Sequence, residues 1–197
     1  MSSAARRAFI VRPFGIKNEI NFDEVEEKLI APALERLGIE GRTTGEIVGQ
    51  GNIRVDMFQL LLTADLVVAD LSIHNANVFY ELGIRHSLRD KHTFLLRCDA
   101  DRFPFDLQTD RYFVYRKDAL GESVEALARA LRETIDSGRT NSPVFASLPN
   151  MKEQDPTQFV AVPLDFGEDV GRAAADEQIG DLGLLAAEVK GSQWGVE

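Results

Sequence analysis

The stretch ADLSIHNANVFYELGIRH, residues 69–86, decides the fold of this chain. The run at 66–69 is apolar, contains β-branched side chains and ends at Asp70, which is typical of a central parallel strand covered on both faces. The residues that follow change to helical spacing, and Asn77 is suited to cap the start of that helix. A strand ending in Asp70 and a helix carrying Glu81 predict one strand–helix unit of an open α/β sheet.

The same alternation continues along the first two thirds of the chain. We therefore expect a flavodoxin-like three-layer sandwich, with a central parallel sheet of about five strands and helices on both faces. The pattern predicts strands at 8–12, 39–44, 66–70, 93–97 and 112–115, and helices at 22–37, 53–63, 77–89 and 121–137.

The composition of the chain changes after residue 145. Prolines at 149, 156 and 163 and an acidic stretch interrupt the pattern, and only one further helix is predicted, near 182–189. We expect residues 1–145 to form the α/β domain and residues 146–197 to form a linker and the start of a second, helical module. The chain is then expected to be the N-terminal part of a longer protein.

Composition also limits the functional classes. The 197 residues are 44% hydrophobic and 27% charged, which suits one well-buried domain with an appendage. The net charge of −10 is spread along the chain, and no Lys/Arg cluster alternates with aromatics, which argues against nucleic acid. No apolar run approaches the ~18–20 residues of a membrane span, so we expect no membrane partner. The lack of a signal-peptide pattern and the lone Cys98, expected to be buried, indicate a reducing cytoplasm.

Several catalytic patterns are disfavoured. The three histidines, at 74, 86 and 92, lack the spacing of a metal site, and His86 is expected on a helix surface. The glycines at 49–51 do not form a dinucleotide fingerprint, and no G-x-S-x-G elbow is present.

Asp70 and Glu81 are the candidate functional residues because ligands of open α/β sheets bind at the carboxyl ends of the strands. Glu81 is expected within about one turn of the helix start, where the helix dipole favours the ionised carboxylate by roughly 0.3–1 kcal/mol. A simpler interpretation stays open: Glu81 is an ordinary first-turn glutamate, and Asp70 with Ser72 forms a polar turn.

Three segments together resemble a known family: IVRPFG at 10–15, ADLS at 69–72 and NANVFYELGIRH at 75–86. Over about residues 8–136 the chain is similar to bacterial Toll/interleukin-1-receptor-like (TIR-like) nucleotide-binding domains and to the related nucleoside 2-deoxyribosyltransferases. The resemblance implies cleavage of an N-glycosidic bond in NAD or another nucleotide. It further implies a regulated effector of bacterial signalling or anti-phage defence, a homo-oligomer, and a C-terminal helical-repeat module.

The resemblance makes Glu81 the catalytic glutamate. Cleavage passes through an oxocarbenium-like sugar, which a carboxylate can stabilise or attack. Asp70 would hold the base or a ribose hydroxyl, or protonate a leaving base if its pKa were raised. The nicotinamide of NAD is already cationic, so a single carboxylate could suffice. The nucleotide is then the substrate, and no cofactor or metal is expected.

The substrate contacts are expected from two loops. In the first, Arg12 offers a cationic fork for phosphate, although a surface ion pair is an equal alternative. Gly15 permits close backbone approach, and Phe14, which follows Pro13, is a candidate for stacking on a base. In the second loop the candidates are Ser72, Asn75 and Asn77, with turn formation and helix capping as the alternative roles of the two asparagines.

Three functions remain open from the sequence. The first is a glycohydrolase of NAD or another nucleotide, and the second is a nucleoside 2-deoxyribosyltransferase. The third is a non-catalytic module that senses a nucleotide or forms homotypic contacts. The third differs from the others because its binding and signalling would survive replacement of Glu81 by Gln.

Overall fold

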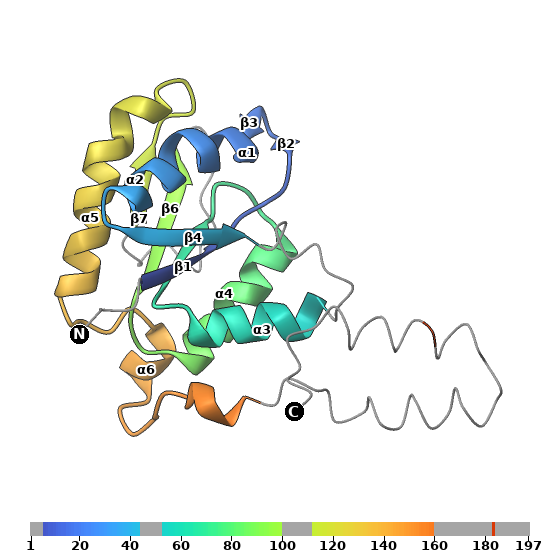
Figure 1. Cartoon of the computed structure of the whole chain (residues 1–197), viewed down its shortest axis with the longest axis vertical. Coiled ribbons are helices and arrows are strands. Elements are labelled where there is room, and N and C mark those ends of the chain that lie inside the picture. The colour runs from blue at the N-terminus through green and yellow to red at the C-terminus, as the bar shows by residue number, and fades with distance from the viewer. Residues whose placement is uncertain (1–5, 44–52, 100–111, 160–182, 184–197) are drawn as a thin grey trace.

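The computed structural model describes residues 6–43, 53–99, 112–159 and 183. Its core is a five-stranded parallel sheet in the order β4-β1-β5-β6-β7 (Figure 1). Counted along the chain this order is 2-1-3-4-5, the doubly wound arrangement of flavodoxin-like folds, so the predicted fold class is confirmed. The strands are β1 (Arg6–Val11), β4 (Ile39–Thr43), β5 (Leu66–Asp70), β6 (Thr93–Cys98) and β7 (Tyr112–Tyr115).

Helices cover both faces of the sheet (Figure 1). A helical segment follows β1 and consists of α1 (Phe22–Val25), the π-helical turn η1 (Glu26–Ile30) and α2 (Ala31–Glu35). It packs beside α5 (Val124–Asp136), which the short 3-10 helix η4 (Leu120–Ser123) precedes. On the opposite face lie α3 (Ile53–Thr63) and α4 (Ala76–Leu88).

Side chains that alternate in direction along each strand pack into two apolar cores, one on each face of the sheet. In β1, Ile10 joins the cluster under α1, α2 and α5, whereas Phe9 joins the cluster under α3 and α4. In β5, Val68 and Val67 divide in the same way. Successive side chains of a strand point to opposite faces, and every residue of β5 is buried, as the uninterrupted apolar run at 66–69 predicts.

A small hairpin after β1 was not expected from the sequence. It consists of β2 (Ile16–Lys17) and β3 (Ile20–Asn21), which pair antiparallel. The two residues between them, Asn18 and Glu19, have positive φ angles of 48° and 61°, as in the tight turns whose twist suits a two-residue hairpin. The asparagine tolerates this backbone conformation better than most residues do.

The segment after α5 packs back onto the domain. Ser142 Oγ donates to the carbonyl of His86 at 2.6 Å and caps α6 (Pro143–Ser147). Farther along, the Gln154 amide donates to the Leu88 carbonyl at 3.0 Å. The boundary predicted at residue 145 therefore lies inside the packed region, which continues to η5 (Pro156–Gln158). The helix predicted at 182–189 falls outside the described residues, apart from Gly183.

Candidate functional site

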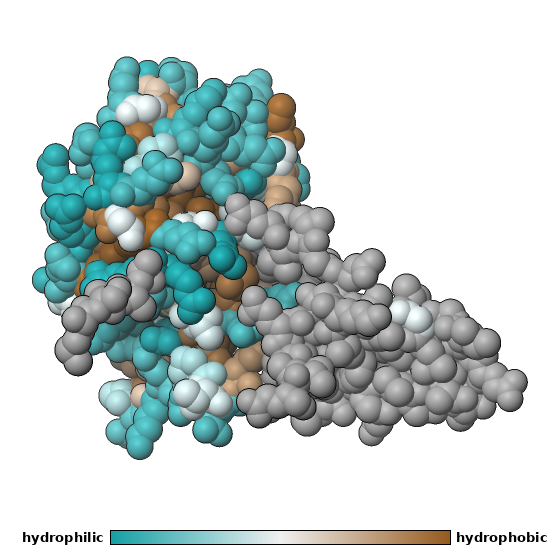
Figure 2. Space-filling model, in the orientation of Figure 1, coloured by the Kyte–Doolittle hydropathy of each residue, from teal (hydrophilic) through white to brown (hydrophobic). Residues whose placement is uncertain are grey.

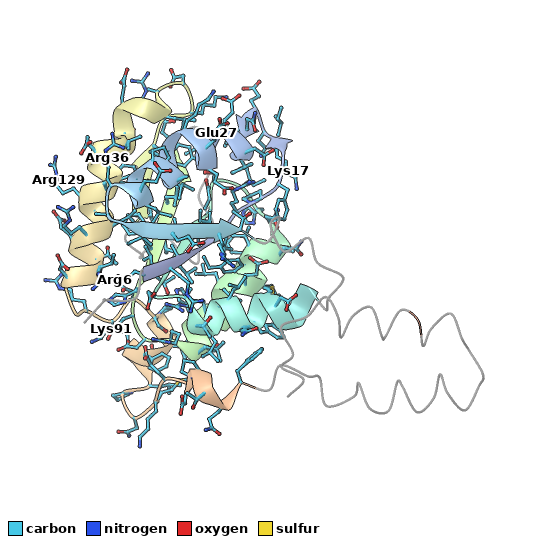
Figure 3. The ribbon with its side chains drawn as sticks, viewed as in Figure 1. Arg6, Lys17, Glu27, Arg36, Lys91 and Arg129 are labelled. Atoms are coloured by element: carbon cyan, nitrogen blue, oxygen red, sulfur yellow. The ribbon has the colours of Figure 1, made fainter. Side chains whose placement is uncertain are left out.

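Buried charge singles out three residues. Charged side chains such as Arg6, Lys17 and Glu27 are exposed on the surface (Figure 3). Among the described Asp, Glu, Lys and Arg residues, Asp70 and Arg85 are 0% exposed and Glu81 is 8% exposed. Burying a charge is costly unless partners compensate it.

Arg85 is compensated by the end of a helix. Its Nη1 donates to the carbonyls of Leu61 and Ala64 at 2.6 and 3.1 Å, and its Nη2 donates to that of Lys91 at 3.1 Å. These bonds satisfy the last carbonyls of α3 and place the cation at the negative end of that helix. Burial lowers the pKa of Arg85 to about 9, so the side chain stays cationic at neutral pH. Its role is structural.

Glu81 has no such compensation from the described part of the chain. It precedes Arg85 by one helical turn, but the guanidinium is turned to the end of α3. Within the ranges that the structure describes, no hydrogen bond or ion pair holds the Glu81 carboxylate. Burial raises its pKa from 4.5 to about 7.

The helix dipole does not stabilise the ionised form of Glu81 as the sequence predicts. Because α4 begins at Ala76, Glu81 is its sixth residue, roughly 8 Å along the axis from the first at 1.5 Å per residue. The dipole acts mainly within the first turn, so burial dominates and the pKa moves in the direction opposite to the one expected.

The capping residue of α4 is Asn75, and the expectation of Asn77 was wrong. The Asn75 side-chain oxygen accepts from the amides of Asn77 and Val78 at 3.0 and 3.3 Å. The Asn75 backbone is extended, with φ of −129° and ψ of 114°, as is usual for a cap. This oxygen is therefore already engaged, whereas Asn77 is exposed in the first turn of α4.

Asp70 faces inward. Its Oδ1 accepts from the Ser72 amide at 2.9 Å, and its Oδ2 accepts from the Tyr115 hydroxyl at 2.8 Å. Burial raises the pKa of Asp70, while these bonds and the charge of Arg12 oppose that rise. The predicted roles of Asp70 in binding substrate or protonating a base do not fit this geometry, because both oxygens are engaged and enclosed.

Ser72 is likewise an internal residue. Its hydroxyl accepts from the Cys98 amide at 2.6 Å and lies 3.0 Å from the Tyr115 hydroxyl. The side chain is 2% exposed, so the predicted contact with substrate is not available in this structure. Cys98 is a buried thiol, as predicted.

Arg12 is engaged in ion pairs, the alternative that the sequence left open. Its Nη1 lies 2.9 Å from Asp23 Oδ1 and donates to the carbonyl of Pro13 at 2.9 Å. Its Nε pairs with Glu26, the first residue of η1. The guanidinium thus anchors the loop after β1 to the helix and does not present a free fork to a phosphate.

The remaining residues of that loop differ in exposure. Pro13 is buried, but Phe14 is 48% exposed and its ring centre lies 5.6 Å from the Arg12 guanidinium carbon. Gly15 has a φ of +68°, which favours glycine, and its carbonyl accepts from the Phe22 amide at 3.1 Å. Phe14 therefore keeps the geometry needed to stack on a ligand.

The two loops are adjacent because β1 and β5 pair in parallel, with Val11 opposite Ala69. This pair is the point at which the strand order reverses, where open α/β sheets bind ligands. Among the described residues, burial alone raises the pKa of Glu81, and neither Glu81 nor Asp70 contributes to the pKa of the other. The structure brings the loop after β1 and the turn after β5 together at this point, with Asp70 directed into the protein.

Other features of the described regions do not add to this site. His86 is buried, contrary to the predicted surface position, and burial and Arg85 lower its pKa to about 4. No group of three His, Cys, Asp or Glu residues among those described could hold a metal ion. None of the described helices is long and apolar enough to cross a bilayer.

Two cavities lie at the opposite, amino-terminal ends of the strands. The larger, of about 830 Å³, is bordered by the starts of β6 and β7 and the end of α5. The smaller, of about 270 Å³, lies beside the starts of β1 and β4, where apolar atoms show on the largely hydrophilic face of Figure 2. Neither is lined by a predicted site residue. Residues 44–52 and 100–111, which follow β4 and β6 in the chain, are outside the described ranges.

Comparison with known proteins identifies no family. No family model matches the chain, and no curated protein does. Among solved structures, the lysine decarboxylase LdcF of Francisella novicida is similar, with 13% identity and a TM-score of 0.44. The match covers 91% of this chain but only 24% of that one, so the chain spans about a quarter of the decarboxylase.

Proposed function

We propose that this protein cleaves the N-glycosidic bond of NAD or a related nucleotide, with Glu81 as the catalytic carboxylate. The observation that carries the proposal is the state of Glu81: it is buried, it has no hydrogen bond or ion pair among the described residues, and its pKa is raised to about 7. An uncompensated buried carboxylate lowers stability, and perturbed groups of this kind are concentrated at functional sites.

The chemistry needs only one carboxylate. The bond between the sugar carbon and the nicotinamide nitrogen breaks, and its electron pair goes to the ring, which leaves as a neutral base. Ionised Glu81 stabilises the positive charge that develops on the sugar. A water oxygen then bonds to the sugar carbon, and the proton it loses passes to the surrounding water. No acid has to protonate the leaving group, which agrees with an Asp70 that faces inward.

This role has a definite pH dependence. The active form of Glu81 is the ionised one, so the rate should rise with pH and level off above the pKa of about 7. A charged substrate bound nearby would move the midpoint, but the sign of the dependence would stay the same.

The second candidate is a nucleoside 2-deoxyribosyltransferase. An uncharged nucleobase leaves more readily when it is protonated, and a carboxyl group with a pKa near 7 can supply that proton. In this case the rate falls as pH rises through about 7, and a second base intercepts the sugar. The third candidate, a sensing or homotypic interaction module, binds nucleotide without turnover and retains binding when Glu81 is replaced.

The biological setting is proposed from the sequence resemblance. It suggests a TIR-like effector of bacterial signalling or anti-phage defence, located in the cytoplasm. It also suggests that a homo-oligomer and a C-terminal helical module regulate the activity. The exposed side chains of Phe14 and Asn77 are the best placed of the predicted residues to contact the nucleotide.

The test is an assay for release of free base. The purified full-length protein is incubated with NAD, other nucleotides and deoxynucleosides, with and without a second base, and products are separated by chromatography. The variant Glu81→Gln removes the charge, and Glu133→Gln makes the same change at an exposed position of α5. Base release from NAD that only Glu81→Gln abolishes supports the hydrolase. Transfer to the added base supports the second candidate, and binding without release supports the third.

A further inference from the structure

A buried polar cluster lies beneath the carboxyl ends of three neighbouring strands, and the proposed chemistry does not use it. The cluster consists of Asp70 at the end of β5, Ser72 in the following turn, Cys98 at the end of β6 and Tyr115 at the end of β7. Each of the four is at most 2% exposed. Buried polar groups of this kind are costly unless every member is satisfied.

The hydrogen bonds of the cluster all run in one direction. The Tyr115 hydroxyl donates its single proton to Asp70 Oδ2 at 2.8 Å, so it must accept the proton of Ser72 Oγ, 3.0 Å away. Ser72 Oγ in turn accepts from the Cys98 amide at 2.6 Å. Since the Ser72 amide donates to Oδ1 at 2.9 Å, both oxygens of Asp70 act as acceptors.

This arrangement favours an ionised Asp70, because the carboxylate accepts a hydrogen bond at each of its oxygens. A protonated carboxyl group would have to donate through Oδ2, and the Tyr115 and Ser72 hydroxyl protons would then have to reorient. Burial raises the pKa of this carboxyl group, and the groups that oppose the rise are the hydroxyl and amide of Ser72, the hydroxyl of Tyr115 and the guanidinium of Arg12, which follows β1. Tyr115 itself stays neutral, because burial and the nearby Asp70 both raise its pKa.

The cluster also fixes the backbone that leads into α4. Ser72 is held by its amide and its hydroxyl, and the Leu71 amide donates to the Leu96 carbonyl of β6 at 2.9 Å. Only three residues separate Ser72 from Ala76, the first residue of α4, and one of them is the cap Asn75. The placement of Glu81 therefore depends on the turn that the cluster holds.

We propose that Tyr115 is a positioning residue for the candidate site: by donating to Asp70 it keeps the carboxylate ionised and holds the 71–75 turn that delivers Glu81. Its effect on activity rests on the proposed function, whereas its effects on Asp70 and on the turn do not. Tyr115→Phe removes one oxygen atom and keeps the packing of the ring. Tyr112→Phe makes the same change on the same strand, away from Asp70.

The first experiment follows the Asp70 carboxyl carbon by NMR during a pH titration of the full-length protein, with Asp70→Asn to assign the signal. Loss of one charge-assisted hydrogen bond should raise the Asp70 midpoint by about one pH unit or more in Tyr115→Phe. Tyr112→Phe should leave it unchanged. An Asp70 midpoint that is the same in wild type and Tyr115→Phe would overturn the proposal.

The second experiment is hydrogen exchange, which needs no activity. Amides of residues 71–78 should exchange at least about tenfold faster in Tyr115→Phe, because the turn loses one of its fixed points, while those of α5 should not change. Equal exchange rates at 71–78 would contradict the positioning role. If Tyr115→Phe does not fold, Ser72→Ala removes the middle hydroxyl of the chain, and a shift of the Asp70 midpoint in the same direction and faster exchange at 71–78 are expected.

The activity readout separates this proposal from the proposed function. If wild type releases base, Tyr115→Phe should lower kcat about tenfold or more with KM within about twofold, since Glu81 is displaced but the nucleotide contacts remain. An unchanged kcat would overturn the link to Glu81. If wild type releases no base but the Asp70 midpoint and the exchange rates shift as expected, the proposed function fails and the structural role of Tyr115 stands.

Discussion

Replacing Glu81 with Gln should make the protein increasingly more stable relative to wild type as the pH rises from about 4.5 to 7, and the gain should be complete above that range. Burial raises the pKa of Glu81 from 4.5 to about 7. Between these two pH values the folded protein keeps the Glu81 proton, whereas the unfolded chain has released it. In that pH window the wild type therefore loses stability as pH rises. Gln has nearly the same shape and no charge, so the variant does not share this loss.

The magnitude follows from the size of the shift. A rise from 4.5 to about 7, at about 1.4 kcal/mol per pH unit, corresponds to about 3 kcal/mol of destabilisation once Glu81 is ionised. For a domain of this size that is a difference in Tm of about 6–12 °C. The buried amide of Gln carries its own cost, but that cost does not depend on pH. The informative quantity is therefore the change with pH of the difference between variant and wild type.

The assay is urea denaturation of both proteins at intervals between about pH 4 and pH 8.5. The free energy of unfolding of Glu81→Gln relative to wild type should increase by about 3 kcal/mol across this range, with the midpoint of the change between 4.5 and 7. Glu133→Gln, at an exposed position of α5, should show no such increase. A difference between Glu81→Gln and wild type that stays constant with pH would refute the reasoning.

Four further substitutions test how the site is held. Arg85→Lys should lower the free energy of unfolding by about 2–3 kcal/mol in urea denaturation, because one ammonium group cannot reach both the carbonyls at the end of α3 and that of Lys91. An unchanged unfolding midpoint would contradict this. Gly15→Ala should lower the free energy of unfolding by about 1–2 kcal/mol, and the cause is the φ of +68° alone, since a Cβ there meets no atom within 4 Å. An unchanged Tm would contradict this prediction. Asn75→Ala should cost about 1 kcal/mol and Asn77→Ala much less, and equal losses would show that the cap is misassigned.

The elements of the fold were predictable because local sequence patterns specify them. β5 is an uninterrupted buried run, and it was predicted with its correct limits of Leu66 and Asp70. The helix that carries Glu81 was also predicted, one residue short at its start. Two asparagines stand at 75 and 77, and spacing alone does not decide which of them adopts the extended backbone of a cap.

The internal character of Asp70 was not predictable from local sequence. Its partner Tyr115 is 45 residues away, and the two meet only because β6 lies between β5 and β7 in the sheet. Asp70 was correctly placed at a strand end, but the direction of its carboxylate depends on contacts across three strands. The same limit applies to Ser72, whose hydroxyl is engaged by β6 and β7.

For Glu81, too, local sequence predicted the position of the residue but not its tertiary contacts. Its position in a helix after a buried strand was readable from the sequence. That no described residue pairs with it was not readable, because Arg85 at the i+4 position suggests an ion pair on an exposed helix face. Arg85 instead caps α3, a contact with residues more than twenty positions earlier in the chain.

The measurement that tests the central claim most directly is the rate of base release from NAD by full-length wild type and by Glu81→Gln, compared at about pH 8.5, where the carboxylate is ionised. The account predicts that wild type releases nicotinamide and that Glu81→Gln is at least about a hundredfold slower with its fold intact. Release at the same rate by both proteins, or no release by wild type that binds NAD, would contradict it.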